Sequence, residues 1–382
     1  MFRVMEVLFW LSLAALLYVY IGYPLLLVLI SQFVRRRLPK QNYEPFLSIL
    51  IAAYNEEAGI QEKLEQTLSL EYPPEKMEII VLSDGCTDRT DEIVQSLNDH
   101  RIRLLHITGR MGKTNAQNEG VKHARGDVLV FSDATTIYHA EALRYLASNY
   151  IDGRVGAVSG RYQYFDPEGE SPTRLGTVAF WNYENCIKMM QSRIRTISGC
   201  CGCIYSVRRE AYTALAPDVI SDLVQPLHVI GQGYRVIFED RALAYEETTQ
   251  STSEEFSMRV RVITRGIHGL LSVPSLLMPW KHGWVSFQLW SHKILRWLVP
   301  FFLLALLYSN LFLLQLPFSR LFFLVQVGFY LITMLSLFVP VQRVWRPLGI
   351  PLYFCTLNAA AFCSVMEVLR GKKYVIWETV RS

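Results

Sequence analysis

Four short apolar runs decide the fold of this chain: FLSILIAA at residues 46–53, MEIIVLS at 77–83, IRLLHI at 102–107 and DVLVFS at 127–132. Each run is bounded by turn-forming or polar residues, as expected of a buried strand. Helix-like segments lie between the runs, at residues 56–70, 88–98 and 114–124. This alternation predicts an α/β domain whose mainly parallel sheet is covered on both faces.

The loops that follow these strands carry polar residues, at 54–59, 84–90 and 133–136. In open α/β sheets ligands bind beyond the carboxyl ends of the strands, so we expect the binding site here. The loop Tyr54–Glu56 suits a nucleotide base and ribose, although Asn-Glu at a helix start is also a plain cap. Asp84 is placed to accept hydrogen bonds from a uracil or a ribose, with an ordinary turn as the alternative.

One basic and two acidic residues are candidates for phosphate binding and proton transfer. The glycine pair in Gly109–Thr114 presents Lys113 to a diphosphate, but the first glycine of a P-loop is missing, and a surface lysine is the alternative. Asp133 ends the fourth strand, where a carboxylate can hold a divalent cation that bridges two phosphates. Asp222 begins an apolar, helix-like stretch and is a candidate general base, with a helix N-cap as the alternative.

Composition separates the chain into apolar ends and an ordinary middle. Hydrophobic residues make up 51% of the chain and charged residues 19%, and the apolar excess lies in the first thirty residues and after about position 297. A net charge of +4 is too small to indicate a nucleic-acid partner. The seven cysteines form no regular framework, and the Cys200–Cys203 cluster lacks zinc-like spacing. We therefore expect small buried thiols in that cluster.

The apolar run Val7–Val34 predicts a membrane anchor. It exceeds the length of about 20 residues that spans a bilayer and is too long for the core of a signal peptide. Arg35, Arg36 and Arg37 follow directly, and basic residues beside a span favour the cytoplasmic side. The expected organisation is an anchor at 1–37 followed by a cytoplasmic α/β domain at 38–250.

The last third of the chain is also expected to associate with the membrane. Interfacial helices are expected at 251–297, where arginines and tryptophans alternate with apolar residues. About three transmembrane segments and a basic tail are expected at 298–382. One N-terminal and three C-terminal spans place the basic tail opposite the catalytic domain, against the positive-inside rule. Either the rule is broken here or one apolar run is re-entrant or interfacial.

Seven motifs, taken in order, resemble those of the family 2 glycosyltransferases with a GT-A fold. Within that family, the chain resembles the membrane-integrated group that includes cellulose, chitin, hyaluronan and poly-N-acetylglucosamine synthases. The resemblance runs from about Ser48 to Gly266 and rests on ILIAAYNEE, VLSDGCTDRT, GKTNAQNEG, VLVFSDAT, SGCCGCIYSVRRE, ISDLVQPL and RVRVITRG. It implies a GT-A domain with a mixed, mainly parallel sheet, joined to transmembrane and interfacial helices.

The resemblance also implies roles for individual residues. The residues expected to bind the donor are Ala53, Tyr54, Glu56, Asp84, Lys113 and Asp133. The residues expected on the acceptor side are Gly199, Cys200, Cys201 and Gly202. Asp222 matches the base of the family's Thr-Glu-Asp-type motif. Arg259 and Arg261 match the basic positions of its Gln-x-x-Arg-Trp-type motif and would stabilise the departing diphosphate.

Three positions depart from the family pattern. Asp133–Ala134–Thr135 replaces Asp-x-Asp, so the metal would be held by Asp133 with Thr135 as a weak ligand. Ser221 stands where an acid precedes the base. Val262 replaces the tryptophan that forms an aromatic platform for a growing sugar chain, which favours single transfer over polymerisation.

The resemblance therefore implies an inverting hexosyltransferase that uses a UDP-sugar with Mg²⁺ or Mn²⁺. The acceptor would be lipid-linked or a glycan, at the cytoplasmic face of a bacterial inner membrane, with membrane lipids and possible export or assembly proteins as partners. One alternative is a processive β-polysaccharide synthase coupled to export. Another, of a different class, is an inactive nucleotide-sugar sensor or assembly subunit.

Overall fold

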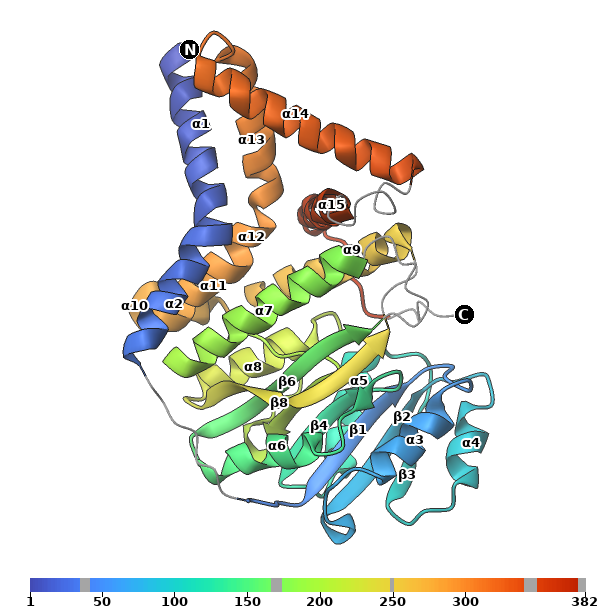
Figure 1. Ribbon diagram of the computed structural model, residues 1–382. Coiled ribbons are helices and arrows are strands. Elements are labelled where there is room, and N and C mark those ends of the chain that lie inside the picture. The colour runs from blue at the N-terminus through green and yellow to red at the C-terminus, as the bar shows by residue number, and fades with distance from the viewer. Residues whose placement is uncertain (35–41, 166–173, 248–250, 340–348, 377–382) are drawn as a thin grey trace.

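The computed structural model describes residues 1–34, 42–165, 174–247, 251–339 and 349–376. One eight-stranded sheet forms the base of the molecule, and long helices rise from one side of it (Figure 1). The strands lie in the order β3-β2-β1-β4-β7-β6-β8-β5. In chain order they are β1 Leu47–Ala53, β2 Met77–Asp84, β3 Ile102–Ile107, β4 Val128–Asp133, β5 Ile137–Tyr138, β6 Val155–Phe165, β7 Ile204–Arg208 and β8 Arg235–Glu247.

The first half of the sheet is parallel and the second half is mixed. β1 pairs in parallel with β2 and β4, and β2 with β3, which brings the carboxyl ends of all four strands to one edge. β7 runs antiparallel to β4 and β6, while β6 and β8 are parallel. The prediction of a mixed, mainly parallel sheet is confirmed.

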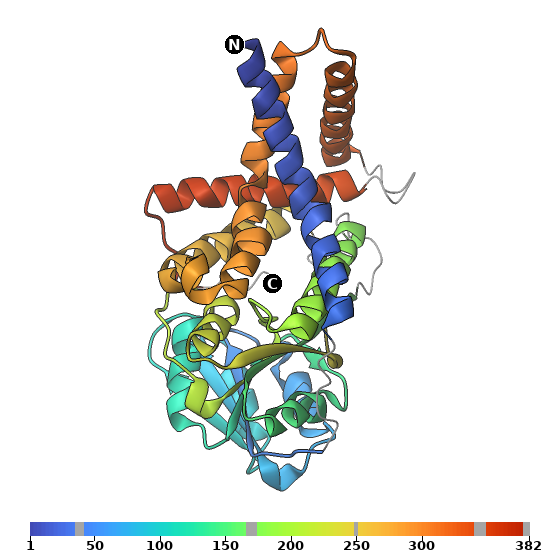
Figure 2. The same ribbon diagram turned by 90° about the vertical axis from the view of Figure 1, so that its left-hand side faces the viewer.

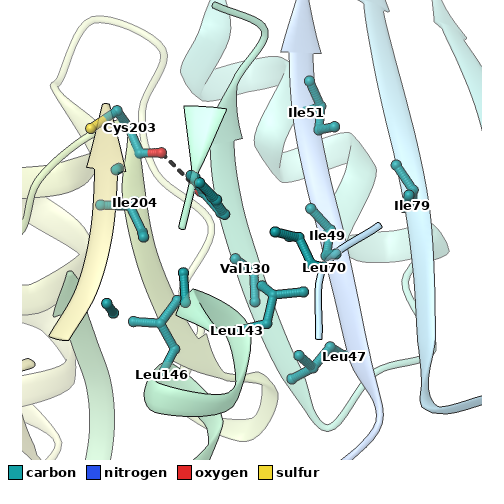
Figure 3. Packing of buried hydrophobic residues seen from close by; sticks show 14 of the residues in the cluster. Leu47, Ile49, Ile51, Leu70, Ile79, Val130, Leu143, Leu146, Cys203 and Ile204 are labelled. Atoms are coloured by element: carbon teal, nitrogen blue, oxygen red, sulfur yellow. Dashed lines mark hydrogen bonds between the residues drawn. The ribbon is translucent and has the colours of Figure 1, made fainter. Parts of the chain in front are cut away.

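Both faces of the central strands are covered. All residues of β1 and β2 are buried, which explains why these strands are continuous apolar runs and not alternating ones. Leu47, Ile49 and Ile51 of β1 pack beside Val130 of β4 in the core on one face, and Leu143 packs over them (Figure 3). The sheet is therefore a rigid base for the loops at its carboxyl edge.

The expected strands appear within one residue of their predicted ends, and the first helix is shorter than predicted. Helix α3 runs Ile60–Leu68, although a helix-like pattern begins at Glu56. The Glu56 and Glu57 N–H groups donate instead to the side chains of Thr90 and Asp88 in the next loop. Helices α4 (Thr90–Ser96) and α5 (Lys113–His123) lie where helices are predicted.

Three helices are long and apolar enough to cross a membrane, and a bent pair would make a fourth. The first joins α1 (Phe2–Leu17), a π-helical turn (Tyr18–Gly22) and α2 (Tyr23–Phe33). The others are α14 (Pro317–Phe338) and α15 (Gly349–Leu369). The bent pair is Trp284–Trp297 with α13 (Val299–Phe312), at 56°.

The N-terminal apolar helix is packed against the α/β domain. Tyr23 and Leu27 of α2 lie in one buried cluster with Ile187 of α7 (Arg174–Ile194). The Gln191 amide donates to the Tyr23 hydroxyl at 2.7 Å. This contact fixes the position of the sheet relative to the apolar helices.

Helix α15 lies across the direction of α1 and α13. It is seen end-on in Figure 1 and lengthwise in Figure 2, whereas α1 is upright in both views. It packs along the amphipathic helix α9 (Thr252–Leu271), where the Ser364 hydroxyl donates to the Val260 carbonyl at 3.1 Å. The most apolar stretch of α15 is 39% buried, compared with 6% in α14, so α15 faces protein far more than α14 does.

Candidate active site

The loops that follow β1 and β2 are joined by hydrogen bonds. The Thr87 N–H donates to the Asn55 side chain at 2.8 Å, and the Glu56 N–H donates to the Thr90 hydroxyl at 2.8 Å. Asn55 has a φ of 53°, a left-handed conformation that turns the chain sharply after Ala53, the last residue of β1. The backbone around the predicted nucleotide contacts is therefore held in place by the loop itself.

Tyr54 connects this pair of loops to the loop after β3. The guanidinium carbon of Arg110 lies 3.8 Å from the centroid of the Tyr54 ring, a cation–π contact. Arg110 belongs to the segment that leads into Lys113. The predicted base-binding and diphosphate-binding loops are thus in direct contact.

Asp84 organises the loop that carries Lys113. The Asp84 side chain is fully buried, and its two oxygens accept from the N–H groups of Met111 at 2.8 Å and Gly112 at 2.9 Å. Gly112 has a φ of +89°, which a residue with a side chain rarely adopts. The structure therefore gives this carboxylate a role in loop geometry beside the nucleotide contact predicted for it.

Lys113 and Asp133 meet at the carboxyl edge of the sheet. Lys113 is the first residue of α5, Asp133 is the last of β4, and their side chains form an ion pair. Burial acts to lower the pKa of Lys113, but the Asp133 carboxylate outweighs it and raises that pKa. The ammonium is therefore charged at neutral pH, as contact with a diphosphate requires.

Asp222 lies close enough to this pair for its charge to act on Lys113. It is in the first turn of α8 (Ser221–Gly231), where Ile220 is the N-cap residue, so the alternative of an Asp222 N-cap is wrong. Burial raises the pKa of Asp222, and the nearby Lys113 opposes the rise only in part. A carboxylate with a raised pKa beside a cleft has the character of a general base.

The glycine turn predicted on the acceptor side touches Asp222. The Cys200 N–H donates to the Asp222 carbonyl at 2.8 Å. A Cβ on Gly202 would lie 2.7 Å from the Asp222 carboxylate, so any other residue here would require that carboxylate to shift. Cys200 and Cys201 are buried, and no group of three potential metal ligands occurs among the described His, Cys, Asp and Glu residues.

The predicted metal position has hard oxygen atoms. Asp133 offers a carboxylate, and the hydroxyl of Thr135 lies nearby, donating to Glu246 at 3.1 Å. Mg²⁺ is commonly held by one or two carboxylates together with substrate phosphates and water, so this set fits a cation that arrives with a diphosphate. Asp133 and Thr135 would hold it.

A cavity of about 360 Å³ opens beside Asp222. It is enclosed by α7, α9, α15 and the helical segment Trp290–Trp297, and Gly199 and Cys200 line it from the glycine turn. Val262 also lines it, at the position of the missing tryptophan. Aromatic side chains reach the cavity from other elements instead, among them Phe180, Trp181 and Tyr353.

This geometry can be compared with known proteins. Residues 48–215 match the family described as glycosyl transferase family 2. They are a family 2 glycosyl transferase domain. The chain is 28% identical over 233 residues to a poly-beta-1,6-N-acetyl-D-glucosamine synthase of Staphylococcus epidermidis, with 59% of this chain and 55% of the relative covered. The same-named protein of Staphylococcus aureus strain COL is 27% identical over the same length. The chain thus spans about half the length of the curated relatives it matches.

The fold of the glycosyl transferase domain and its helices recurs in a solved structure. Superposition on the mannosyltransferase PcManGT from Pyrobaculum calidifontis, a complex with GDP-Man and Mn²⁺, gives a TM-score of 0.73. The alignment covers 96% of this chain and 99% of that one, at 20% identity. The prediction of a GT-A fold with membrane helices is confirmed.

The arginines of α9 divide between the two sides of the transferase site. Arg259 lies at the helix-lined cavity, where its guanidinium donates to Glu255 at 2.7 Å and to the Tyr353 hydroxyl at 3.1 Å. The contact of Arg259 with the departing diphosphate stays a prediction. Arg261 is half-buried on the same helix. Burial lowers the pKa of Arg265, and the charge of Arg261 acts in the same direction.

Several residues of the site could not be recognised as site residues from the sequence. Arg265 donates to the Thr114 hydroxyl at 2.8 Å and so braces the helix that begins with Lys113. Lys188 and Lys293 line the cavity near Asp222; Lys293 lies in the segment predicted as interfacial, and no element was predicted around Lys188. The sequence pattern of α9 indicated a helix on a membrane surface and did not show which of its arginines face the domain.

Proposed function

We propose that this protein transfers a sugar from a UDP-sugar to a hydroxyl of a lipid-linked or glycan acceptor, with inversion at the anomeric carbon. The observation that carries the proposal is the meeting of Lys113, Asp133 and Asp222 at one sheet edge, with a cavity on the Asp222 side. The similarity to polysaccharide synthases supports sugar transfer. Lys113 would contact the donor diphosphate and Tyr54 the nucleotide.

The reaction needs one base and one stabilised leaving group. Asp222 accepts the proton of the acceptor hydroxyl as its oxygen attacks the anomeric carbon. The bond between that carbon and the diphosphate oxygen breaks, and the nucleoside diphosphate leaves with the bonding electrons. Lys113 stabilises the charge that develops on the diphosphate. A divalent cation, when bound, would neutralise further phosphate charge.

The catalytic domain and the described part of the basic tail are proposed to share the cytoplasmic side of the membrane. The Lys373 ammonium lies 2.6 Å from the Asp218 carboxylate of the transferase domain, and His268 contacts the Lys372 carbonyl at 3.0 Å. Since α15 lies across α1, we treat it as interfacial, which leaves the tail beside the domain. The positive-inside rule is then satisfied. Arg35–Arg37 lie outside the described residues.

Protease access to a C-terminal tag tests this orientation. In inside-out vesicles the tag and the transferase domain should be cleaved together, and in right-side-out vesicles both should be protected. Cleavage of the tag alone in right-side-out vesicles would show that α15 crosses the membrane.

Nucleotide release in lipid nanodiscs tests the transfer reaction. A panel with UDP-GlcNAc, UDP-glucose and GDP-mannose, each with Mg²⁺ or Mn²⁺, should give turnover with a UDP-sugar. Asp222→Asn should lower turnover by about 10²–10⁴-fold while donor binding and the unfolding temperature stay near those of the parent. An Asp222→Asn rate equal to the parent rate overturns the base assignment. No turnover with any donor favours the sensor alternative.

The size of the product separates single transfer from polymerisation. With Val262 in place of an aromatic platform, we expect a single added sugar on a radiolabelled product. A ladder of products would support the processive alternative, with the aromatic side chains of α7 and α15 serving as the platform.

A further inference from the structure

The cavity beside Asp222 has walls that suit a hydrocarbon chain. Most of its lining is apolar or aromatic, and it includes Phe180 of α7, Trp297, and Phe354 of α15. Tyr20 lines it from the N-terminal anchor, so the cavity lies where the transferase domain meets the apolar helices. The apolar and aromatic side chains of this wall offer few partners to the hydroxyls of an oligosaccharide, whereas an apolar chain loses nothing by burial against them.

Two of the four cations that line the cavity are already neutralised. Arg259 is paired with Glu255, the side chains meeting at 2.7 Å. Arg296 is paired with Glu184, which also lies 3.2 Å from His292. Burial alone would raise the pKa of Glu184, but Arg296 and His292 hold it well below its usual range. In these two pairs the positive and negative charges cancel.

Besides Glu184, whose charge also acts on both of them, the other two cations have one carboxylate on the cavity wall, Asp222. Lys188 contacts the Cys201 thiol at 3.1 Å, and Lys293 makes no hydrogen bond or ion pair with any residue that the structure describes. The Cε of Lys293 lies 4.0 Å from the position of a Cβ on Gly199, which places it in the same corner as Asp222. This corner therefore has one positive charge in excess. An unpaired ammonium away from bulk water is costly, so the site suits an anionic ligand.

We propose that this cavity binds an acceptor lipid whose head group carries phosphate, with Lys293 contacting the phosphate and the walls of α7 and α15 enclosing the first part of the hydrocarbon chain. The inference rests on the proposed transfer reaction, because it places the acceptor hydroxyl at Asp222. Of the two acceptor classes in the proposed function, the inference favours a lipid phosphate over a neutral glycan. Lys293 recognises the charge, and the apolar walls distinguish a lipid from free phosphate.

Binding of short matched amphiphiles tests the inference without donor or turnover. The probes are farnesyl phosphate, farnesol and inorganic phosphate, added to the detergent-solubilised full chain. Quenching of tryptophan fluorescence and the shift in unfolding temperature report binding, since Trp181 and Trp297 line the cavity. Farnesyl phosphate should bind at least about tenfold more tightly than farnesol or phosphate alone, as expected of a charge-assisted contact added to apolar burial.

Three variants assign the effect to Lys293. Lys293→Met should remove the preference for farnesyl phosphate over farnesol, and Lys293→Arg should keep most of it. Lys281→Met is the matched control, because Lys281 is an exposed lysine in the same interfacial region and does not line the cavity. Equal binding of farnesol and farnesyl phosphate to the parent chain overturns the proposal, as does an unchanged preference in Lys293→Met.

The binding test and the test of the proposed reaction can fail independently of each other. Selective binding of farnesyl phosphate without turnover on any donor would leave the lipid-phosphate site standing and remove the transfer reaction. Turnover onto a neutral oligosaccharide, with no selective binding of farnesyl phosphate, would do the reverse.

Discussion

The donor side and the acceptor side of this site are built in different ways. On the donor side, loops that follow adjacent parallel strands hold one another through short hydrogen bonds, as Asp84 holds Met111 and Gly112 at 2.8 and 2.9 Å. On the acceptor side, the cavity is enclosed by helices from six regions of the chain and has mainly apolar walls. The donor side is thus a rigid edge of the sheet, whereas the acceptor side depends on how the helices pack.

The comparison indicates which property a substitution on each side should change. Changes on the donor side should alter binding of a charged ligand and leave the fold intact, since the sheet core carries the stability. Changes on the acceptor side should alter either the position of Asp222 or the packing of α15. Four predictions test this division.

The largest effect is expected from Lys113→Met. The substitution removes the ammonium that faces the diphosphate and leaves Asp133 without its partner, so kcat/KM should fall by about 100-fold or more. Steady-state nucleotide release and calorimetric titration with UDP measure it. Lys122→Met, on the same helix at an exposed pair with Glu119, should change neither quantity. Equal effects of the two variants would refute the donor role.

A smaller effect is expected from Gly202→Ala. The new Cβ would lie 2.7 Å from the Asp222 carboxylate, so the base must shift, and kcat should fall by about 10–100-fold, as misplaced reacting groups commonly cause. Gly199→Ala is the control, because its Cβ meets Leu223 at 3.3 Å and not the carboxylate. UDP affinity should remain unchanged in both. A drop in UDP affinity for Gly202→Ala would break the division between the two sides.

The pH dependence of turnover should reflect Asp222. Because burial raises the pKa of Asp222, the base is protonated at a higher pH than an exposed aspartate, and activity is lost as pH falls through that raised value. Below it kcat/KM should fall about tenfold for each pH unit. Rate profiles between about pH 4 and 9, set beside UDP affinity over the same range, measure this. A profile that stays flat down to the ordinary aspartate range would contradict the assignment.

The smallest effect concerns the packing of α15. A Cβ on Gly176 of α7 would lie 2.3 Å from the Tyr353 Cβ, so Gly176→Ala should push α15 away and cost about 1–3 kcal/mol, as overpacking usually does. A lower unfolding temperature with unchanged UDP binding is the expected result. Gly328→Ala on α14, where no atom lies within 4 Å, should not lower it. Weakened UDP binding in Gly176→Ala would show that the two sides are coupled.

Much of the donor side could be predicted from the sequence. A buried parallel strand is a continuous apolar run, and the residue at its carboxyl end enters a loop at the binding edge, so Asp84 and Asp133 could be located from local pattern alone. Their partners could not be predicted. Whether Asp84 faces a ligand or the N–H groups of Met111 and Gly112 depends on how the next loop folds back over the strand.

The sequence by itself determined the apolar ends, the α/β alternation and the order of the motifs, because these follow from short-range periodicity and composition. Only the tertiary structure decided that α15 lies across α1, that Arg296 pairs with Glu184 by the cavity, and that Lys293 comes close to Asp222. Charge pairing and helix direction depend on contacts between residues far apart in the chain. Hydropathy records whether a side chain avoids water, but it does not distinguish a lipid neighbour from a protein one.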